Sequence, residues 1–516
     1  MKGDDSRLGL VRDDPLWVTH KCLTGPKYPC TRRARRPSSS RNSRRNDEQR
    51  APAAQGFVLT RVLTLERAIQ LAIVATVVTA VLAAGALLSW LEPARKLRWA
   101  ALLVLFALSL VAARRARARA HPASTYAAAA GLCALALLSA TWSSRPLSTA
   151  AHALSFILLL AACVALAQAV RGRPEAIRAV LDGVLAATAV VALGGLLVLL
   201  FRHDRALAPA TTSLPVRYQG LGGGPDTATM VMAVGVPLAA RALADTWRRI
   251  AGLLPAALLL LLLGSIVASG SRGALLAAFG GLLAYVLIGF RGARQRTLLA
   301  AGVAAVFVLS ALLTRLPKPL DTPPAAARPG ASAAPAWLKP RPGYVDANVV
   351  LRLNDDIGHP LPGVADTTPS PRTLFGTSGR AEAWQGALEL GAKRPLLGYG
   401  LGREDDVFVD RYVDFNSNQP ENSYIGLFLQ LGGVGVAVFM LLVGSLAVRA
   451  LRAPARLLEP ERRLVAACAG AFAAGLVLAF FQTYIYAVGS NAAAAVWICA
   501  FMLAAAATLR DTSARG

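Results

Sequence analysis

Long apolar blocks alternate with short polar segments over most of this chain. The blocks run for roughly 18–25 residues, which is the length that an α-helix needs to cross about 30 Å of hydrocarbon. One of them, residues 254–268, reads LPAALLLLLLGSIVA, and a soluble amphipathic helix would keep a polar face. The pattern predicts an all-α integral membrane protein with about 12 transmembrane helices. The expected spans are residues 68–90, 97–113, 123–142, 148–170, 176–201, 228–245, 250–268, 273–290, 297–314, 423–448, 464–486 and 490–508.

The spacing of these blocks divides the chain into five parts. Residues 1–56 are basic, polar and without hydrophobic periodicity, which predicts a disordered cytoplasmic tail. Residues 57–314 hold helices 1–9, and residues 315–422 form a large extracytoplasmic loop between helices 9 and 10. Residues 423–508 hold helices 10–12, and residues 509–516 form a short cytoplasmic tail.

The second half of the large loop shows a helical signal. Ser378 is a plausible N-cap for a helix that starts at Arg380, and Trp384 and Leu388 lie one turn apart on it. Gly391 then ends the helix. We expect an amphipathic helix that lies on the membrane surface or caps a cavity between the spans.

The balance of charge supports a membrane location rather than a nucleic-acid partner. Only 16% of the residues are charged and 55% are hydrophobic, although the net charge is +26. Much of the positive charge lies in the first fifty residues, and the rest gathers between apolar blocks. The loops expected inside carry arginine clusters at residues 114–119, 171–178, 241–249, 291–296 and 449–463. The positive-inside rule then predicts an inner-membrane protein with both termini cytoplasmic and no nucleic-acid partner.

Four segments expected on the outer side hold polar groups that are costly at a membrane boundary. They are residues 216–229 (VRYQGLGGGPDTAT), 269–273 (SGSRG), 377–402 (TSGRAEAWQGALELGAKRPLLGYGLG) and 419–425 (QPENSYI). No His/Cys spacing or acidic pair typical of a metal site accompanies them. We therefore predict neither a metal nor a cofactor.

The order of these four segments resembles the C-terminal region of O-antigen ligases and polymerases. That family has a GSRG-type turn, a loop helix of SGR-x-x-x-W type ending in P-L-L-G-x-G, and an (H/E/D)-N-S-Y-like box. The resemblance runs from about Arg217 to Val448. It implies metal-independent, inverting transfer of a glycan from undecaprenyl diphosphate at the outer face of the inner membrane. The acceptor would be lipid A core for a ligase or a second lipid-linked glycan for a polymerase. The other partners that the resemblance implies would be membrane lipids and a chain-length regulator protein.

The resemblance suggests roles for five residues in the outer segments. The departing lipid diphosphate needs fixed cations, and the planar guanidinium group suits phosphate oxygens. Arg217, Arg272 and Arg380 are the candidates, with Arg272 also counted as catalytic. The acceptor hydroxyl needs a base, for which Glu421 is the candidate, and Asn422 is its hydrogen-bonding neighbour.

Alternative interpretations exist for each of these residues. Arginines in outer loops commonly anchor a protein at the membrane interface, and Glu421 could simply face a helix dipole. Trp384 is better explained as a packing or interface anchor than as a platform for sugars. Ligases of the family usually carry His at the position of Glu421, so this chain leans towards the polymerase side.

A transporter or flippase for lipid-linked oligosaccharides is the rival function. A transporter should show two related halves and polar or broken helices near the middle of the membrane. The sequence shows no obvious duplication, and its polar groups gather at the outer face instead. Both observations favour a transferase.

Overall fold

The computed structural model describes residues 51–85, 88–116, 124–208, 216–313, 380–408 and 419–509. The predicted disorder of residues 1–50, the N-cap at Ser378 and the C-terminal tail beyond residue 509 lie outside these ranges. The predicted tail was too long at its end, because α2 (Ala51–Leu82) already begins at Ala51. Alanines favour helix there, and Pro52 is compatible with a first helical turn.

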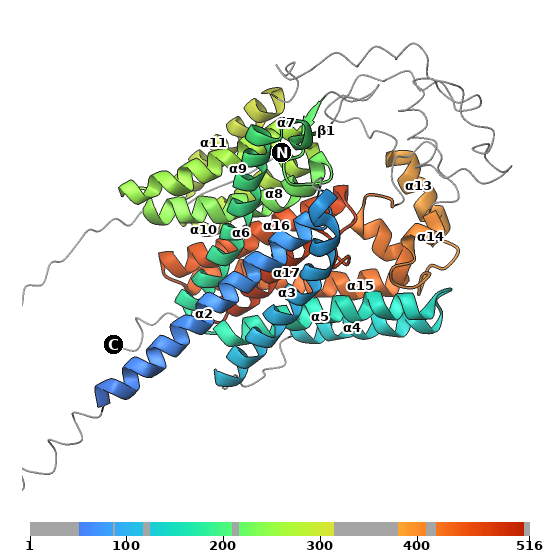
Figure 1. Cartoon of the computed structure of the whole chain (residues 1–516), viewed down its shortest axis with the longest axis horizontal. Coiled ribbons are helices and arrows are strands. Elements are labelled where there is room, and N and C mark those ends of the chain that lie inside the picture. The colour runs from blue at the N-terminus through green and yellow to red at the C-terminus, as the bar shows by residue number, and fades with distance from the viewer. Residues whose placement is uncertain are drawn as a thin grey trace, which may run out of the picture. The chain divides into compact units, whose positions relative to one another are not determined.

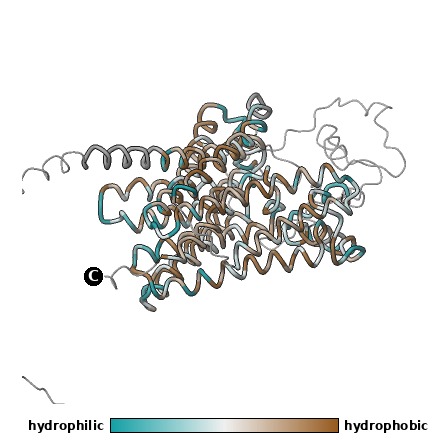
Figure 2. The backbone as a smooth tube through the Cα atoms, turned by 90° about the horizontal axis from the view of Figure 1, so that it is seen from below, coloured by the Kyte–Doolittle hydropathy of each residue, from teal (hydrophilic) through white to brown (hydrophobic). Residues whose placement is uncertain are grey.

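The described chain is an all-α integral membrane protein (Figure 1). Eleven helical segments among the described residues are long and apolar enough to cross a membrane, and one shorter apolar helix follows them. The long helices after α2 are α3 (Leu88–Arg115), α4 (Ser124–Leu138), α5 (Pro146–Val170), α6 (Pro174–Phe201), α8 (Pro225–Thr246), α9 (Leu253–Ser269), α10 (Arg272–Gly289), α11 (Ala293–Leu313), α15 (Ser423–Arg452), α16 (Glu459–Phe481) and the shorter α17 (Ala493–Ala506). Each corresponds to one predicted span. Hydrophobic residues follow these helices, and hydrophilic residues gather at the turns between them (Figure 2).

Smaller elements connect the long helices. The short α-helices are α7 (His203–Ala206), α13 (Arg380–Gly391) and α14 (Glu404–Phe408), and single 3-10 turns are η1 (Ser139–Thr141), η2 (Ile250–Gly252) and η4 (Ala453–Arg456). A two-residue strand β1 (Leu207–Ala208) pairs antiparallel with β2 (Arg217–Tyr218).

The last two predicted spans are separated by a longer irregular stretch than expected. Helix α16 ends at Phe481, and residues 482–492 follow without regular helix before α17 begins. Helix α17 has 14 residues, which gives it a length of about 21 Å at 1.5 Å per residue. All of its residues are buried, and Trp497 donates a hydrogen bond to the Ile485 carbonyl at 2.7 Å. This helix is therefore part of the protein core rather than a lipid-facing rod.

Helices α10 and α16 cross at a contact between two glycines. A Cβ atom on Gly281 would lie 2.6 Å from the Gly470 carbonyl oxygen, and one on Gly470 would lie 2.7 Å from the Gly281 oxygen. Such a contact is possible only without side chains, and small residues are what allow membrane helices to approach closely. It holds the two helices together midway between the polar groups at their ends.

Helix α15 is broken at Gly432, where the chain takes a left-handed φ of 64°. The turn at residues 395–400, which is the PLLGYG motif, packs into the break. Pro395 O accepts from Gly433 N at 2.7 Å, and Tyr399 N donates to Leu429 O at 2.9 Å. The backbone groups released by the break are thus paired with the turn, as an apolar environment requires. We call residues 395–400 the wedge.

Helix α13 packs on α15 next to the wedge. Ala383, Ala387 and Leu390 form the buried side of α13 and contact a small apolar cluster that includes Leu429 and Phe408. The amphipathic helix predicted in the large loop is therefore present, and its apolar side faces α15. This docking brings Arg380, the first residue of α13, towards the start of α15.

Candidate functional site

Arg217 is held by the small antiparallel pair of β1 and β2, where it lies opposite Ala208. The glycines that follow it allow close approaches rather than free movement. A Cβ on Gly223 would lie 2.1 Å from the Ala84 carbonyl oxygen near the end of α2. The glycine-rich segment is therefore closely packed where it leads into α8, and Asp226 lies in the first turn of that helix.

Arg272 is the first residue of α10, directly after a tight turn. Gly270 takes a left-handed φ of 65°, which glycine adopts without strain. The Ser269 hydroxyl accepts from Ser271 N at 3.1 Å, and the Ser271 hydroxyl accepts from Ala274 N at 3.4 Å as the N-cap of α10. The SGSRG motif is thus a tight turn stabilised by its own serine hydroxyls, and it fixes the backbone position of Arg272.

Arg380 and Glu421 form an ion pair between the loop helix and the start of α15. Arg380 Nε donates to Glu421 Oε2 at 2.7 Å, and Arg380 Nη2 also contacts this oxygen. The side chains are 23% and 26% exposed. Trp384, one turn along α13, donates from Nε1 to the Pro420 carbonyl at 2.7 Å. Trp384 therefore acts as a packing anchor, as the sequence favoured, and it ties α13 to the turn that carries Glu421.

Glu421 has an unusual backbone conformation. Its φ of 47° makes it the one non-glycine residue with positive φ among the residues that the structure describes. A left-handed conformation costs a non-glycine residue roughly 1–3 kcal/mol and persists only where its surroundings enforce it. Such strain gathers at functional sites, so the conformation supports a specific role for this carboxylate.

Asn422 is the N-cap of α15. Its Oδ1 accepts from Tyr424 N at 3.0 Å and from Ile425 N at 3.2 Å, and the residue is 2% exposed. These bonds satisfy backbone donors at the helix start. The structure thus gives Asn422 a structural role next to Glu421, and its contact with a substrate stays a prediction.

The structure brings the predicted charged residues to one place. Arg217 lies within electrostatic range of Asp226, Arg380 and Glu421, and Arg272 lies within range of Arg217, Arg380 and Asp226. Burial raises the pKa of Glu421 above its usual value, and the Arg380 guanidinium opposes that rise. Burial also lowers the pKa of Arg217, which Asp226 opposes. Three cations and two carboxylates from four separate segments thus share one site, and their individual roles stay predictions.

Two polar clusters were not anticipated from the sequence. One surrounds Glu404, a buried carboxyl group in an acidic run directly after the GYGLG glycines. The acidic run was visible, but burial of its first member was not, because its partners come from distant segments.

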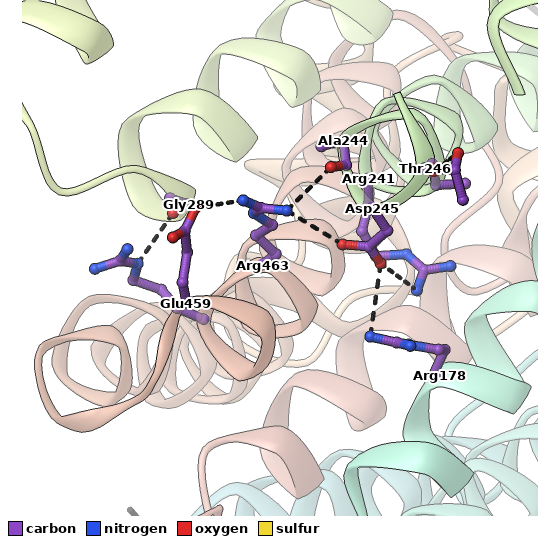
Figure 3. A network of polar contacts seen from close by, with 10 residues as sticks. Arg178, Arg241, Ala244, Asp245, Thr246, Gly289, Glu459 and Arg463 are labelled. Carbon is purple, nitrogen blue, oxygen red and sulfur yellow. Dashed lines mark hydrogen bonds and ion pairs between the residues drawn. The ribbon is translucent and has the colours of Figure 1, made fainter. Parts of the chain in front are cut away.

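The other cluster lies where the C-terminal end of α8 meets the N-terminal end of α16 (Figure 3). These are the helix ends opposite to the site that contains Arg272 and Glu421. Arg241 is 2% exposed and pairs with Asp182, and its Nη1 lies 3.7 Å from Asp245. Asp245 is also approached by Arg178 at 3.6 Å and by Arg463 at 3.4 Å. We call these five residues the opposite-end network. Its arginines belong to the clusters at residues 171–178, 241–249 and 449–463 that the sequence predicts to lie inside, whereas Asp226 lies in the first turn of α8, at the other end of that helix.

No group of three or more His, Cys, Asp or Glu side chains suited to a metal ion occurs in the part of the chain that the structure describes. Metal independence itself stays a prediction.

The fold and the cluster at the helix ends define a multi-pass membrane protein with a highly charged polar site. A family model described as O-antigen ligase matches residues 257–440, which include Arg272, Arg380 and Glu421. This match supports an O-antigen ligase/polymerase-like family and confirms the resemblance that the motifs predicted. A second family model, described as Bax inhibitor 1 like, matches residues 33–258. Each model covers less than half of the chain, and no curated protein matches it.

The family match supports a membrane enzyme of surface polysaccharide biosynthesis with a glycosyltransferase-like activity. In general, such a family implies lipid-linked glycan substrates and a lipid A core acceptor. Together with the apolar helices, it indicates a multi-pass protein of the bacterial inner membrane.

Proposed function

We propose that this protein transfers a glycan from an undecaprenyl-diphosphate carrier at the outer face of the inner membrane, as a polymerase acting on lipid-linked repeats. The observation that carries the proposal is that Arg217, Arg272 and Arg380 lie within electrostatic range of one another, with Glu421 paired to Arg380. Fixed guanidinium groups at a membrane boundary suit a diphosphate, because they are permanently charged and match phosphate oxygens in pairs.

The three arginines would stabilise the leaving group. As the bond between the anomeric carbon and the diphosphate oxygen breaks, negative charge grows on that oxygen. Preorganised cations in a site with little water stabilise this charge more in the transition state than in the ground state. The lipid diphosphate then departs with the electron pair of the broken bond.

Glu421 would accept the proton of the acceptor hydroxyl while that oxygen forms the new glycosidic bond. Attack from the face opposite the diphosphate gives inversion at the sugar carbon. A carboxylate with a raised pKa is a better base than an ordinary one, and burial raises the pKa of Glu421. The ion pair with Arg380 must loosen for this step, and a diphosphate oxygen offers Arg380 the replacement partner.

The orientation also belongs to this proposal. The site and the opposite-end network lie at opposite ends of α8, which has 22 residues and so spans about 33 Å. The arginine-rich end would face the cytoplasm under the positive-inside rule, which leaves the site outside. Both termini are then cytoplasmic.

The decisive test is Arg272→Ala, with Arg294→Ala as the matched control, since Arg294 is an exposed arginine in the first turn of α11. Each variant is produced in a strain that lacks the native gene, and the lipid-linked glycan ladder is analysed beside membrane-protein levels. We expect the Arg272 variant to insert normally and to yield only single repeats, and the control to restore long chains. Long chains from a normally inserted Arg272→Ala protein would overturn the assignment.

The ladder also separates the related functions. A polymerase defect leaves single repeats attached to the acceptor, whereas a ligase defect leaves long chains on the carrier lipid. A transporter defect leaves the repeats unavailable at the outer face. The break in α15 does not favour a transporter, because the wedge pairs the backbone groups that a transporter would offer to its cargo.

A further inference from the structure

Glu404 is a fully enclosed carboxyl group that the proposed reaction does not use. It is the first residue of α14 and is 3% exposed. Its Oε2 accepts from Tyr486 OH at 2.6 Å and from Gln430 Nε2 at 2.8 Å, and its Oε1 accepts from Thr483 Oγ1 at 3.3 Å. Among the described residues, no arginine or lysine forms an ion pair with it. A buried carboxyl group held only by neutral donors is costly and calls for an explanation.

These contacts join three segments that are far apart in the sequence. Gln430 belongs to α15 just before its break, and Tyr486 belongs to the irregular stretch between α16 and α17. Gly402 N donates to Gln430 Oε1 at 2.6 Å, which turns the amide nitrogen of Gln430 towards Glu404. A Cβ on Gly426 would lie 1.8 Å from Tyr486 OH and 2.6 Å from Glu404 Oε1. The first turns of α15 thus fit tightly against the carboxyl group.

The same segments touch the turn that carries Glu421. Ser423 Oγ donates to the Gln482 carbonyl at 2.6 Å and accepts from Tyr484 N at 2.9 Å. On the other side, Gln419 Nε2 donates to Asp405 Oδ1 at 3.0 Å. The neighbours of Glu404 therefore hold Gln419, two residues before Glu421, and Ser423, two residues after it.

We propose that Glu404 is a positioning residue that fastens α14 and residues 482–486 to the start of α15, and so keeps the Glu421 turn in its strained, reactive conformation. The inference rests on the proposed function. Glu404 itself does not touch the substrate, and its effect passes through the hydrogen bonds on either side of Glu421.

The protonation state of Glu404 fits this role. Burial raises its pKa to about 8, the nearby Asp405 adds to the rise, and the hydrogen bonds from Tyr486, Thr483 and Gln430 oppose it. The adjacent Arg403 is paired with Asp406 at 2.7 Å. At neutral pH the group is therefore mostly a neutral carboxylic acid, and the Thr483 hydroxyl can either donate to it or accept from it. A glutamine has nearly the same shape and hydrogen-bonding capacity.

The test compares Glu404→Gln with Glu404→Ala in purified full-length protein in lipid nanodiscs, with a lipid-linked repeat as substrate. Glu404→Gln should keep kcat within about threefold of wild type. Glu404→Ala should lower kcat by about tenfold or more, equivalent to ~1.4 kcal/mol in the barrier, and leave the donor KM within about threefold because the arginines remain. Glu389→Ala, an exposed carboxylate on α13, is the matched control and should match wild type.

A pH profile separates positioning from simple loss of folded protein. The acid limb is the part of the kcat/KM-against-pH profile where activity falls at low pH. If Glu404 positions Glu421, Glu404→Ala shifts this acid limb to a different pH. A smaller amount of folded protein instead lowers the whole profile without shifting it. If the alanine variant does not fold, Tyr486→Phe removes a single hydrogen bond to Glu404 and should give an intermediate loss of kcat.

Two results would overturn the proposal. One is a folded Glu404→Ala protein with wild-type kcat and an unshifted acid limb. If Glu404→Ala does not fold, the same result in Tyr486→Phe would overturn the proposal. The other is a Glu404→Gln protein as impaired as the alanine variant, which would mean that the ionised form is needed. Failure of the proposed function looks different, because it leaves Arg272→Ala fully active.

Discussion

Replacing Gly398 with alanine tests whether the wedge holds the broken α15 in place. Gly398 takes a φ of 62°, and a Cβ atom there would lie 2.5 Å from Leu429 O and 2.6 Å from the carbonyl carbon of Gln430. Both atoms belong to the α15 backbone beside the break, so they cannot move aside as a flexible side chain would. The alanine must therefore push the wedge out of the helix break.

The expected loss of stability follows from two contributions. A left-handed conformation costs a residue with a Cβ about 1–2 kcal/mol. Moving the wedge also weakens the bonds from Tyr399 N to Leu429 O at 2.9 Å and from Gly400 N to Gln430 O at 2.8 Å, at about 1 kcal/mol each. The total of about 3–4 kcal/mol is a large part of the 5–15 kcal/mol that typically stabilises a folded protein.

The assay is thermal unfolding in detergent. Unfolding is monitored by the fluorescence of a thiol-reactive dye, which labels buried cysteines once they become exposed. Gly398→Ala should lower Tm by several degrees and reduce glycan transfer, because the wedge lies between α13 and Glu404. Gly444→Ala is the matched control and lies in α15 itself, where a Cβ meets nothing within 4 Å. It should leave Tm unchanged or slightly higher, as alanine favours helix by up to about 1 kcal/mol. Equal Tm values for the two variants would refute the reasoning.

Two further predictions concern charge. Glu421 must be deprotonated to act as base, and burial raises its pKa, so kcat/KM should fall with decreasing pH through a pKa above the usual ~4.3 of a glutamate. Glu421→His should move that fall in activity towards the histidine pKa of ~6.5. A fall at the same pH in both proteins would contradict the role of base. Arg241→Gln leaves two carboxylates of the opposite-end network without their buried cation, so it should destabilise the protein by roughly 3–5 kcal/mol and lower Tm, yet leave kcat of the folded fraction near wild type. An unchanged Tm, matching that of the exposed-site variant Arg294→Gln, would exclude a stabilising role for that network.

The helices were largely predictable because the membrane imposes their length and composition. The expected span 148–170 became Pro146–Val170, and 176–201 became Pro174–Phe201. The break at Gly432 was not predictable, because its cause is the wedge, more than thirty residues earlier in the chain. The irregular stretch before α17 was predicted only as the short gap between the expected spans 464–486 and 490–508, although residues 482–492 (QTYIYAVGSNA) are more polar than a helical span.

The sequence predicted which charged residues would lie together in the site, but not their contacts or backbone conformations. Segments on one side of a membrane must meet at the same ends of the helices, so Arg217, Arg272 and Arg380 were expected to share a site with Glu421. The left-handed φ of Glu421 has no local sequence signal, because a turn enforced by Trp384 and by the α15 cap produces it. The role of Glu404 depends on three distant donors, and its position in an acidic run suggests a solvated surface instead.

The docking of α13 on α15 has a consequence for biosynthesis. Arg272 enters the membrane with the corner between α9 and α10, whereas Arg380 and Glu421 come from a later segment that, in the proposed orientation, must first be translocated. Their ion pair can form only once α15 has been inserted and the loop helix has folded back onto it. Under the proposed function, the protein is therefore inactive until α15 has been inserted and α13 has docked on it, because its charged centre is complete only then.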